Sequence, residues 1–222
     1  MRSWLPPLLL IGLGLGALGI ALTNVLIPFP DQVASVATFS GKVYADEQLG
    51  NFEHFPLLIH AHAILGTVFV LIAALQFWPR FRNSYRRAHR ILGYVALACL
   101  VILPISGVVS AIVYPFAGFA GVIPNIVWMT AILFCVAMAW SAIRRRDIVQ
   151  HEAWVLRATA MTIGITLSRL YVPLLVPVLG MEPHRALALV FWMGQGEGLL
   201  IAELWLRRPG GPLARRLARA AA

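Results

Sequence analysis

The sequence predicts an all-α membrane protein built as a bundle of six transmembrane helices. Two observations exclude a soluble domain: 60% of the 222 residues are hydrophobic and only 12% are charged, with a mean hydropathy of +0.81. One core cannot bury such an apolar surplus, which therefore needs lipid as its solvent. A third observation is that the apolar residues form runs of about 20, which match a hydrocarbon core of about 30 Å. We expect a single integral membrane domain over residues 1–222.

The positive charge is concentrated in short arginine clusters between the apolar runs, and it gives the chain a net charge of +9. This distribution is typical of the positive-inside rule and of surfaces that face anionic lipid headgroups. We therefore expect membrane lipids as partners and no nucleic acid. The same rule places the arginine clusters and both termini on the cytoplasmic side of a bacterial inner membrane.

The apolar runs set the bounds of the six expected helices. These are residues 8–27, 57–78, 90–114, 122–143, 152–179 and 185–206. The first run is too long for the apolar region of a typical secretory signal, so we expect it to be retained. The second, LLIHAHAILGTVFVLIAALQFW, is uncharged and of bilayer length. The third contains Pro104 and Gly107, which predict a kink.

The later helices and their connections follow from charge and proline. The fourth helix ends at Arg144–Asp147, which returns the chain to the inside, and the fifth carries Pro173 and Pro177 near its outer end. Residues 28–56 are acidic and not apolar, which predicts an outer loop. This loop is either a solvated connector or a cap over the histidines that follow it. The basic tail at 207–222 is expected to rest on the inner leaflet.

A short phrase with a histidine and a glycine occurs twice. His62 is followed four residues later by Gly66, and His89 by Gly93, within HAILG and HRILG. Four residues make about one helical turn, so each glycine lies beneath its histidine on one helix face. The bare backbone there leaves room for a flat group or for a close neighbouring helix.

Four histidines near helix N-termini form the main chemical hypothesis. The positive end of the helix dipole favours neutral imidazole there. A neutral ring has one unprotonated nitrogen with a free lone pair, which a haem iron requires as a ligand. We expect haem b held by His89 with His151 inside and by His62 with His184 outside. Arginines near the inner pair could meet haem propionates. They are Arg87, Arg90 and Arg157.

An alternative remains open for these histidines, namely that they are interfacial residues that contact lipid phosphate or backbone carbonyls. His60 is a further candidate iron ligand, but it lies about 200° from His62 around a helix. The two side chains cannot both face one cofactor, so at least one of them is expected to be structural.

Buried ionisable groups are the second signal. In a hairpin that turns near Met181–Pro183, residues equally far from the turn lie at equal depth, which pairs Arg169 with Glu197 and Arg157 with Glu203. Unpaired charges in a membrane are costly, so pairing is expected. The groups either form a proton path or quinone site, or they lock two helices together. Such a site would be lined by Arg169, Tyr171, Gln195, Glu197 and Glu203.

A series of residues between about 57 and 207 resembles the bacterial membrane family catalogued as domain of unknown function 2306. The series is His60, Leu65, Gly66, Gln76, Phe77, Arg80, His89, Arg90, Gly93, Tyr94, Gly107, Arg144–Asp147, His151, Trp154, Arg157, Arg169, Trp192 and Glu203. The resemblance implies a helical membrane bundle and no established activity. The six-helix count and the histidines near both faces are also similar to the two-haem b-type cytochromes, which implies electron transfer.

Three functions follow as hypotheses. The first is a b-type haem protein that transfers electrons across the membrane, linked to quinone. The second is a non-catalytic subunit or assembly factor of a larger membrane complex. The third is a proton-coupled transporter of small solutes that uses Glu197. The sequence contains no P-loop, nucleophile elbow or dinucleotide-binding glycine motif of a soluble enzyme.

Overall fold

The computed structural model describes residues 26–211 and the single residues 15, 19, 22 and 213. The expected helix at 8–27 and most of the tail at 207–222 lie outside this part of the chain. All regular elements of the described part are helical. They are α2 (Phe29–Ser40), α3 (Lys42–His54), α4 (Pro56–Phe77), α5 (Pro79–Ser84), α6 (Arg86–Val113), α7 (Gly118–Arg144), α8 (Ile148–Ser168), η1 (Arg169–Tyr171), α9 (Val172–Leu175) and α10 (Pro183–Arg207).

Four of the described helices are long and apolar enough to cross a membrane: α4, α6, α7 and α10. Their bounds follow the expected runs to within a few residues, because a long apolar run needs no tertiary information to be recognised. Pro104 lies inside α6 and Pro124 inside α7, and both helices continue through them. The expectation of an all-α membrane protein is therefore confirmed.

The helix expected at 152–179 is shorter in the structure, which corrects that prediction. Helix α8 ends at Ser168, and the chain continues through η1 and the four-residue α9. Pro173 explains the break, since it has no backbone N–H to donate and its ring clashes with the carbonyl of Arg169 one turn earlier. The sequence remains apolar beyond residue 168, so hydropathy alone did not reveal the end of α8.

Residues 28–56, expected as a loop, form the two short helices α2 and α3. They are separated by Gly41, whose φ of 86° lies in the left-handed region that glycine adopts readily. Helix α3 contacts the ends of the long helices through ring pairs such as Phe52 with His60, whose centroids are 5.0 Å apart. Of the two interpretations of this segment, a solvated connector or a cap over histidines, the contact with His60 favours the cap.

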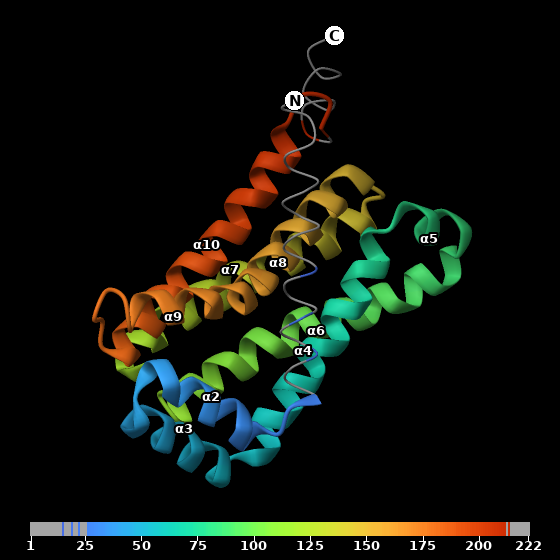
Figure 1. Cartoon of the computed structure of the whole chain (residues 1–222). Coiled ribbons are helices and arrows are strands. Elements are labelled where there is room, and N and C mark those ends of the chain that lie inside the picture. Colours follow the sequence, from blue (N-terminus) through green and yellow to red (C-terminus); the bar gives the residue numbers. More distant parts are fainter. Residues whose placement is uncertain (1–14, 16–18, 20–21, 23–25, 212, 214–222) are drawn as a thin grey trace.

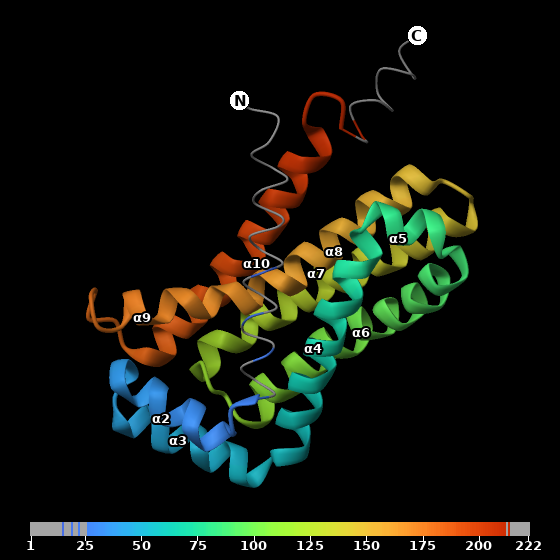
Figure 2. The same cartoon turned by 45° about the vertical axis from the view of Figure 1, so that its right-hand side comes forward.

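The two ends of the bundle differ in composition (Figures 1 and 2). One end holds α5, the turn between α7 and α8, and the C-terminus of α10, and we call it the basic end because these segments carry the arginine clusters. The other end holds α2, α3 and α9, and we call it the cap end. The arginine-rich segments, far apart in the sequence, thus gather at one end.

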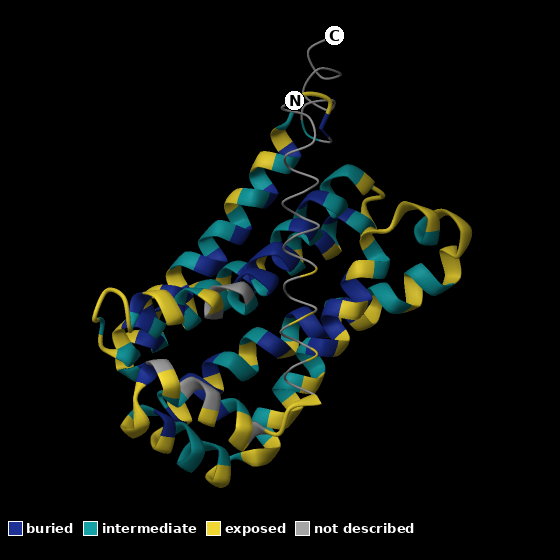
Figure 3. Cartoon of the chain, in the orientation of Figure 1, coloured by how far each residue is buried: buried dark blue, intermediate teal, exposed yellow. Residues whose placement is uncertain are grey.

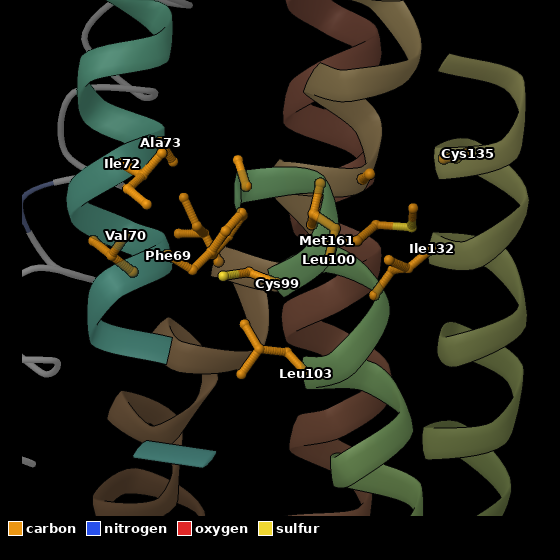
Figure 4. Close-up of a cluster of buried hydrophobic side chains, with 13 residues drawn as sticks. Phe69, Val70, Ile72, Ala73, Cys99, Leu100, Leu103, Ile132, Cys135 and Met161 are labelled. Atoms are coloured by element: carbon orange, nitrogen blue, oxygen red, sulfur yellow. The ribbon is translucent and has the colours of Figure 1, made fainter. Parts of the chain in front are cut away.

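The main core is shared by α4, α6, α7 and α8. Figure 4 shows Phe69, Cys99, Leu100, Ile132 and Met161 meeting there, and each is no more than 2% exposed. Figure 3 shows buried residues on the helix faces that turn inward and exposed residues on the outer faces. A membrane bundle has this pattern because the exposed apolar faces meet lipid.

Helices α8 and α10 approach each other closely along a seam of small residues. A Cβ atom at Gly198 would lie 2.1 Å from the carbonyl oxygen of Ala160, and one at Gly164 would lie 2.1 Å from that of Gly194. Only glycine fits at such a distance, as in other membrane helix pairs that use small residues at their contact. The seam positions the charged side chains of both helices.

Candidate functional site

The inner histidine pair lies at the basic end, where α6 and α8 meet the arginine-rich segments. His89 is in the first turn of α6 and His151 in the first turn of α8. Arg82 of α5 donates to Glu152 of α8 at 2.6 Å. This bond holds α5 against the start of α8, next to His151. The amide of Gln76 donates to the backbone carbonyl of His89 at 3.2 Å and holds the start of α6 against α4.

The two rings of this pair differ in their hydrogen bonds. Nδ1 of His151 lies 3.0 Å from the carbonyl oxygen of Ala139, so this nitrogen carries the proton in the neutral ring and Nε2 keeps a lone pair. Nδ1 of His89 is buried and has no hydrogen-bond partner in the described part of the chain. His89 also lies within electrostatic range of Arg82, His151 and Glu152. The structure therefore brings His89 and His151 into one neighbourhood.

The space beside the two repeated glycines is filled by protein. A Cβ at Gly66 would lie 3.9 Å from Cδ2 of Leu103, and one at Gly93 would lie 3.6 Å from Oε1 of Gln76. The sequence left two possibilities for the space beside each glycine, a flat group or a neighbouring helix. In the structure, both glycines lie against a neighbouring helix. Neither glycine forms a haem slot in this arrangement.

The outer histidines are engaged by other side chains. Nδ1 of His62 lies 2.7 Å from the hydroxyl of Ser106. His184 directs Nδ1 to Glu182 at 2.6 Å and Nε2 to Glu47 at 3.0 Å. Both ring nitrogens of His184 are thus taken by carboxylates, so the outer haem pair does not fit this structure.

The remaining candidates for the haem hypothesis have different surroundings. His60 packs edge-on against Phe52 of the cap. Arg87 and Arg90 are exposed on α6, where they can meet an anionic group. Arg157 is committed elsewhere, because its guanidinium lies 4.5 Å above the ring of Trp154 and donates to Glu203. Arg157 is therefore a poor candidate for a propionate partner.

The ion pair expected between Arg157 and Glu203 is present. Nε of Arg157 donates to Oε1 of Glu203 at 2.5 Å, and the side chains are 12% and 23% exposed. Glu203 also accepts from Arg207 at 2.8 Å, one turn further along α10. Helices α8 and α10, which pack through the seam of small residues, thus carry opposite charges at one depth. This arrangement favours the interpretation that the pair locks the two helices together.

The second expected pair is described only in part. The side chain of Arg169 lies outside the described part of the chain. Its expected partner Glu197 accepts a hydrogen bond from the hydroxyl of Tyr171 at 2.6 Å. Gln195, two residues earlier on α10, is buried, and its Oε1 has no partner within the described residues. Tyr171 and Glu197 each carry an ionisable group, whereas the amide of Gln195 can only accept or donate a hydrogen bond.

Sequence reasoning missed a polar cluster at the cap end. It contains Glu47, Tyr44, Glu182 and His184, which come from α3 and from the start of α10. Burial alone would raise the pKa of Glu182, but the backbone N–H groups of His184 and Arg185 and the ring of His184 hold it below the ordinary value of 4.5. Two sequence signals of this cluster are the acidic segment 28–56, which contains Glu47, and the spacing of two residues between Glu182 and His184. Nothing local says which histidine the carboxylate of Glu47 reaches.

A resident metal site of several protein ligands does not occur in the residues that the structure describes, where no three His, Cys, Asp or Glu side chains form a group able to hold a metal ion. A haem iron needs only two protein ligands, so this finding leaves the inner pair as a candidate. Of the two predicted axial pairs, the pair of His89 and His151 is the one in which the hydrogen bonds leave each ring a nitrogen to offer.

Comparison with known proteins gives one match. A family model described as "Predicted membrane protein (DUF2306)" matches residues 59–206, which include α6, α7, α8 and α10 and nearly all of α4. No curated protein and no solved structure matches the chain.

Proposed function

We propose, for a chain that belongs to the DUF2306 family of predicted membrane proteins, that His89 and His151 hold one haem b near the basic end of the bundle. The observation that carries this proposal is the buried Nδ1 of His89, which has no hydrogen-bond partner in the described part of the chain. Leaving a buried polar nitrogen unpaired costs about 1–3 kcal/mol, so native structures rarely do so without a reason. An iron ligand bond is such a reason.

His151 supports the same proposal through its second nitrogen. Histidines that ligate metals commonly donate the other ring N–H to a carbonyl or carboxylate, which fixes the tautomer and the ring orientation. The contact of His151 Nδ1 with the Ala139 carbonyl has this form. Arg87 and Arg90, exposed on the helix that carries His89, would pair with the propionates.

A haem at this place supplies reversible transfer of one electron, and we propose a membrane electron-transfer role for the chain. The protein groups would orient the imidazoles, exclude water and neutralise the propionates. We further propose quinone as the redox partner, because Tyr171 and Glu197 share a hydrogen bond of 2.6 Å and can take up or release a proton.

Six membrane spans with both termini inside form part of the proposal. Helix α8 has 21 residues, long enough for a core of about 30 Å, and it presents buried residues such as Ala153 and Ala160 to its neighbours. Together with the four apolar helices and the run at 8–27 it gives six spans. The gathering of arginines at the basic end supports a cytoplasmic location for that end in a bacterial inner membrane.

The test is the visible absorption spectrum of the protein purified from haem-replete cells. The wild type is expected to show a Soret band that His89→Ala and His151→Ala each abolish. His54→Ala is the matched control, because His54 is exposed at the end of α3 and contacts the carbonyl of Gly50 and the ring of Phe55, both close to it in the sequence. Helical content measured by circular dichroism separates loss of haem from loss of folding. A Soret band of unchanged intensity in both variants contradicts the proposal.

A second candidate function is a non-catalytic subunit of a larger membrane complex. The filled spaces beside Gly66 and Gly93 favour it, since they leave no flat slot at the repeated phrase. A colourless protein that co-purifies with a larger complex would support this second function over the first.

A further inference from the structure

Helix α3 is joined to the start of α10 by one histidine between two carboxylates. Nε2 of His184 lies 3.0 Å and 3.2 Å from the two carboxylate oxygens of Glu47 on α3. Nδ1 of the same ring lies 2.6 Å from Glu182, which precedes α10. The side chains are 30%, 42% and 48% exposed for His184, Glu47 and Glu182, so protons can reach all three.

The protonation state of the ring decides how many of these contacts attract. A neutral imidazole has one N–H group, so it can donate to only one of the two carboxylates. The other nitrogen would then present a lone pair to a carboxylate oxygen, which repels it. The imidazolium ion donates from both nitrogens and also attracts both negative charges. The observed geometry therefore matches a protonated His184.

We propose that His184 is a pH-operated latch, which holds α3 against the start of α10 when the ring is protonated and releases that contact when the ring loses its proton. An unpaired histidine changes its charge between about pH 5 and 8. The contacts with Glu47 and Glu182 favour the charged ring, so His184 releases its proton at a higher pH than an unpaired histidine. The latch is independent of the haem proposal, because it lies at the cap end and uses none of the residues at the basic end.

The groups that face His184 come from three elements. Helix α3 contributes Glu47 and Tyr44, whose ring lies edge-on at 5.1 Å, and the residue before α10 contributes Glu182. Gly118, at the start of α7, brings no titratable group, and a Cβ there would lie 3.7 Å from Cβ of His184. Glu182 keeps its charge across neutral pH, since the N–H groups of α10 hold its pKa below the ordinary value. The histidine is thus the group that switches.

Other contacts limit the movement to part of the cap. The hydroxyl of Tyr44 donates to the carbonyl of Phe116 at 3.1 Å, and Phe55, next to the C-terminus of α3, stacks on Tyr114 at 5.6 Å. Neither contact titrates near neutral pH, because the pKa of an ordinary tyrosine is about 10. Opening of the latch should therefore loosen the middle of α3 without detaching the cap.

The test is the distance between two spin labels, measured by pulsed electron paramagnetic resonance at about pH 5 and about pH 9 on the full chain in lipid nanodiscs. Labels are placed at Asp46→Cys in the middle of α3 and at Leu179→Cys before α10, since both side chains are exposed. Cys99 and Cys135 are buried and are replaced by alanine so that only the labels react. The wild type should show one short distance at the lower pH and an added longer population at the higher pH.

Three variants make the test decisive. His184→Gln cannot take up a proton and should give the same distance distribution at both pH values, whereas Glu47→Gln removes one carboxylate and should show the longer population at both. Glu53→Gln, exposed on the same helix, is the control and should behave as the wild type. The proposal is overturned if the wild-type distribution does not change with pH. It is equally overturned if either latch variant keeps the wild-type response.

Discussion

At the scale of single residues, Arg157 and Glu203 show what depth alone can predict. Their pairing follows from equal distances to a hairpin turn, a property of helix rise that needs no knowledge of packing. The partners of His62 and His184 could not be predicted this way. Ser106 and Glu47 lie 44 and 137 residues away in the sequence, and only the folded bundle brings them close.

The ion pair makes a prediction about stability. Glu203→Leu leaves the charge of Arg157 in a largely buried position and should lower the free energy of unfolding by about 3 kcal/mol. The double variant Arg157→Met, Glu203→Leu removes both charges and should recover most of this loss, because an apolar pair of similar volume replaces a buried ion pair well. Unfolding in detergent, followed by tryptophan fluorescence, measures both. Equal losses in the single and double variants would contradict a coupled pair.

Glu182 makes a prediction about pH. Its side chain accepts from the backbone N–H groups of His184 and Arg185, so it caps α10, and Glu182→Ala should cost about 1 kcal/mol. Because its pKa is lowered in the folded state, its contribution is present above the ordinary value of 4.5 and is lost as the pH falls through the lower folded value. Stability measured against pH should therefore fall in acid less steeply for Glu182→Gln than for the wild type.

At the scale of elements, the seam between α8 and α10 separates two glycines that look alike in the sequence. Gly198→Ala puts a Cβ 2.1 Å from the carbonyl oxygen of Ala160 and forces the helices apart, at a cost of about 3 kcal/mol. At Gly196 the nearest atom is Cζ2 of Trp128 at 3.7 Å, an ordinary contact. Gly196→Ala should change stability by less than about 1 kcal/mol. Similar thermal stability of the two variants would show that the seam is not tight.

The helices also show where local pattern stops being informative. The bounds of α4, α6, α7 and α10 could be predicted, since hydropathy over about 20 residues depends on the chain alone. The end of α8 could not, because the run stays apolar past Ser168 and proline at 173 decides the break. The helices of the cap were missed for the opposite reason: residues 28–56 lack an apolar period and gain their order from contacts such as Phe55 with Tyr114.

At the scale of the whole molecule, the basic end and the cap end predict an orientation. Single cysteines in a background without Cys99 and Cys135 can report it through a membrane-impermeant maleimide applied to cells whose inner membrane is intact. Val43→Cys, on the exposed face of α3, should react from outside. Asn83→Cys, exposed on α5, should react only after the membrane is opened. The reverse pattern would contradict the orientation while leaving the fold unchanged.

The proposed function depends on the haem site. The sequence predicts two axial pairs, and among the described residues the pair of His89 and His151 is the one whose two rings each keep a nitrogen to offer. The outer pair does not fit because both ring nitrogens of His184 contact carboxylates. One of these carboxylates, Glu47, comes from the segment 28–56, whose folding the sequence did not reveal. The proposed site therefore differs from that of a two-haem cytochrome in the number of haem groups per chain.

The most direct measurement is the amount of haem per chain, determined as the pyridine haemochrome of the purified protein against its concentration. We expect a single haem b per chain, with none remaining in the variant that carries both His89→Ala and His151→Ala. A protein without haem after expression in haem-replete cells, or one that keeps its haem in that double variant, would contradict it.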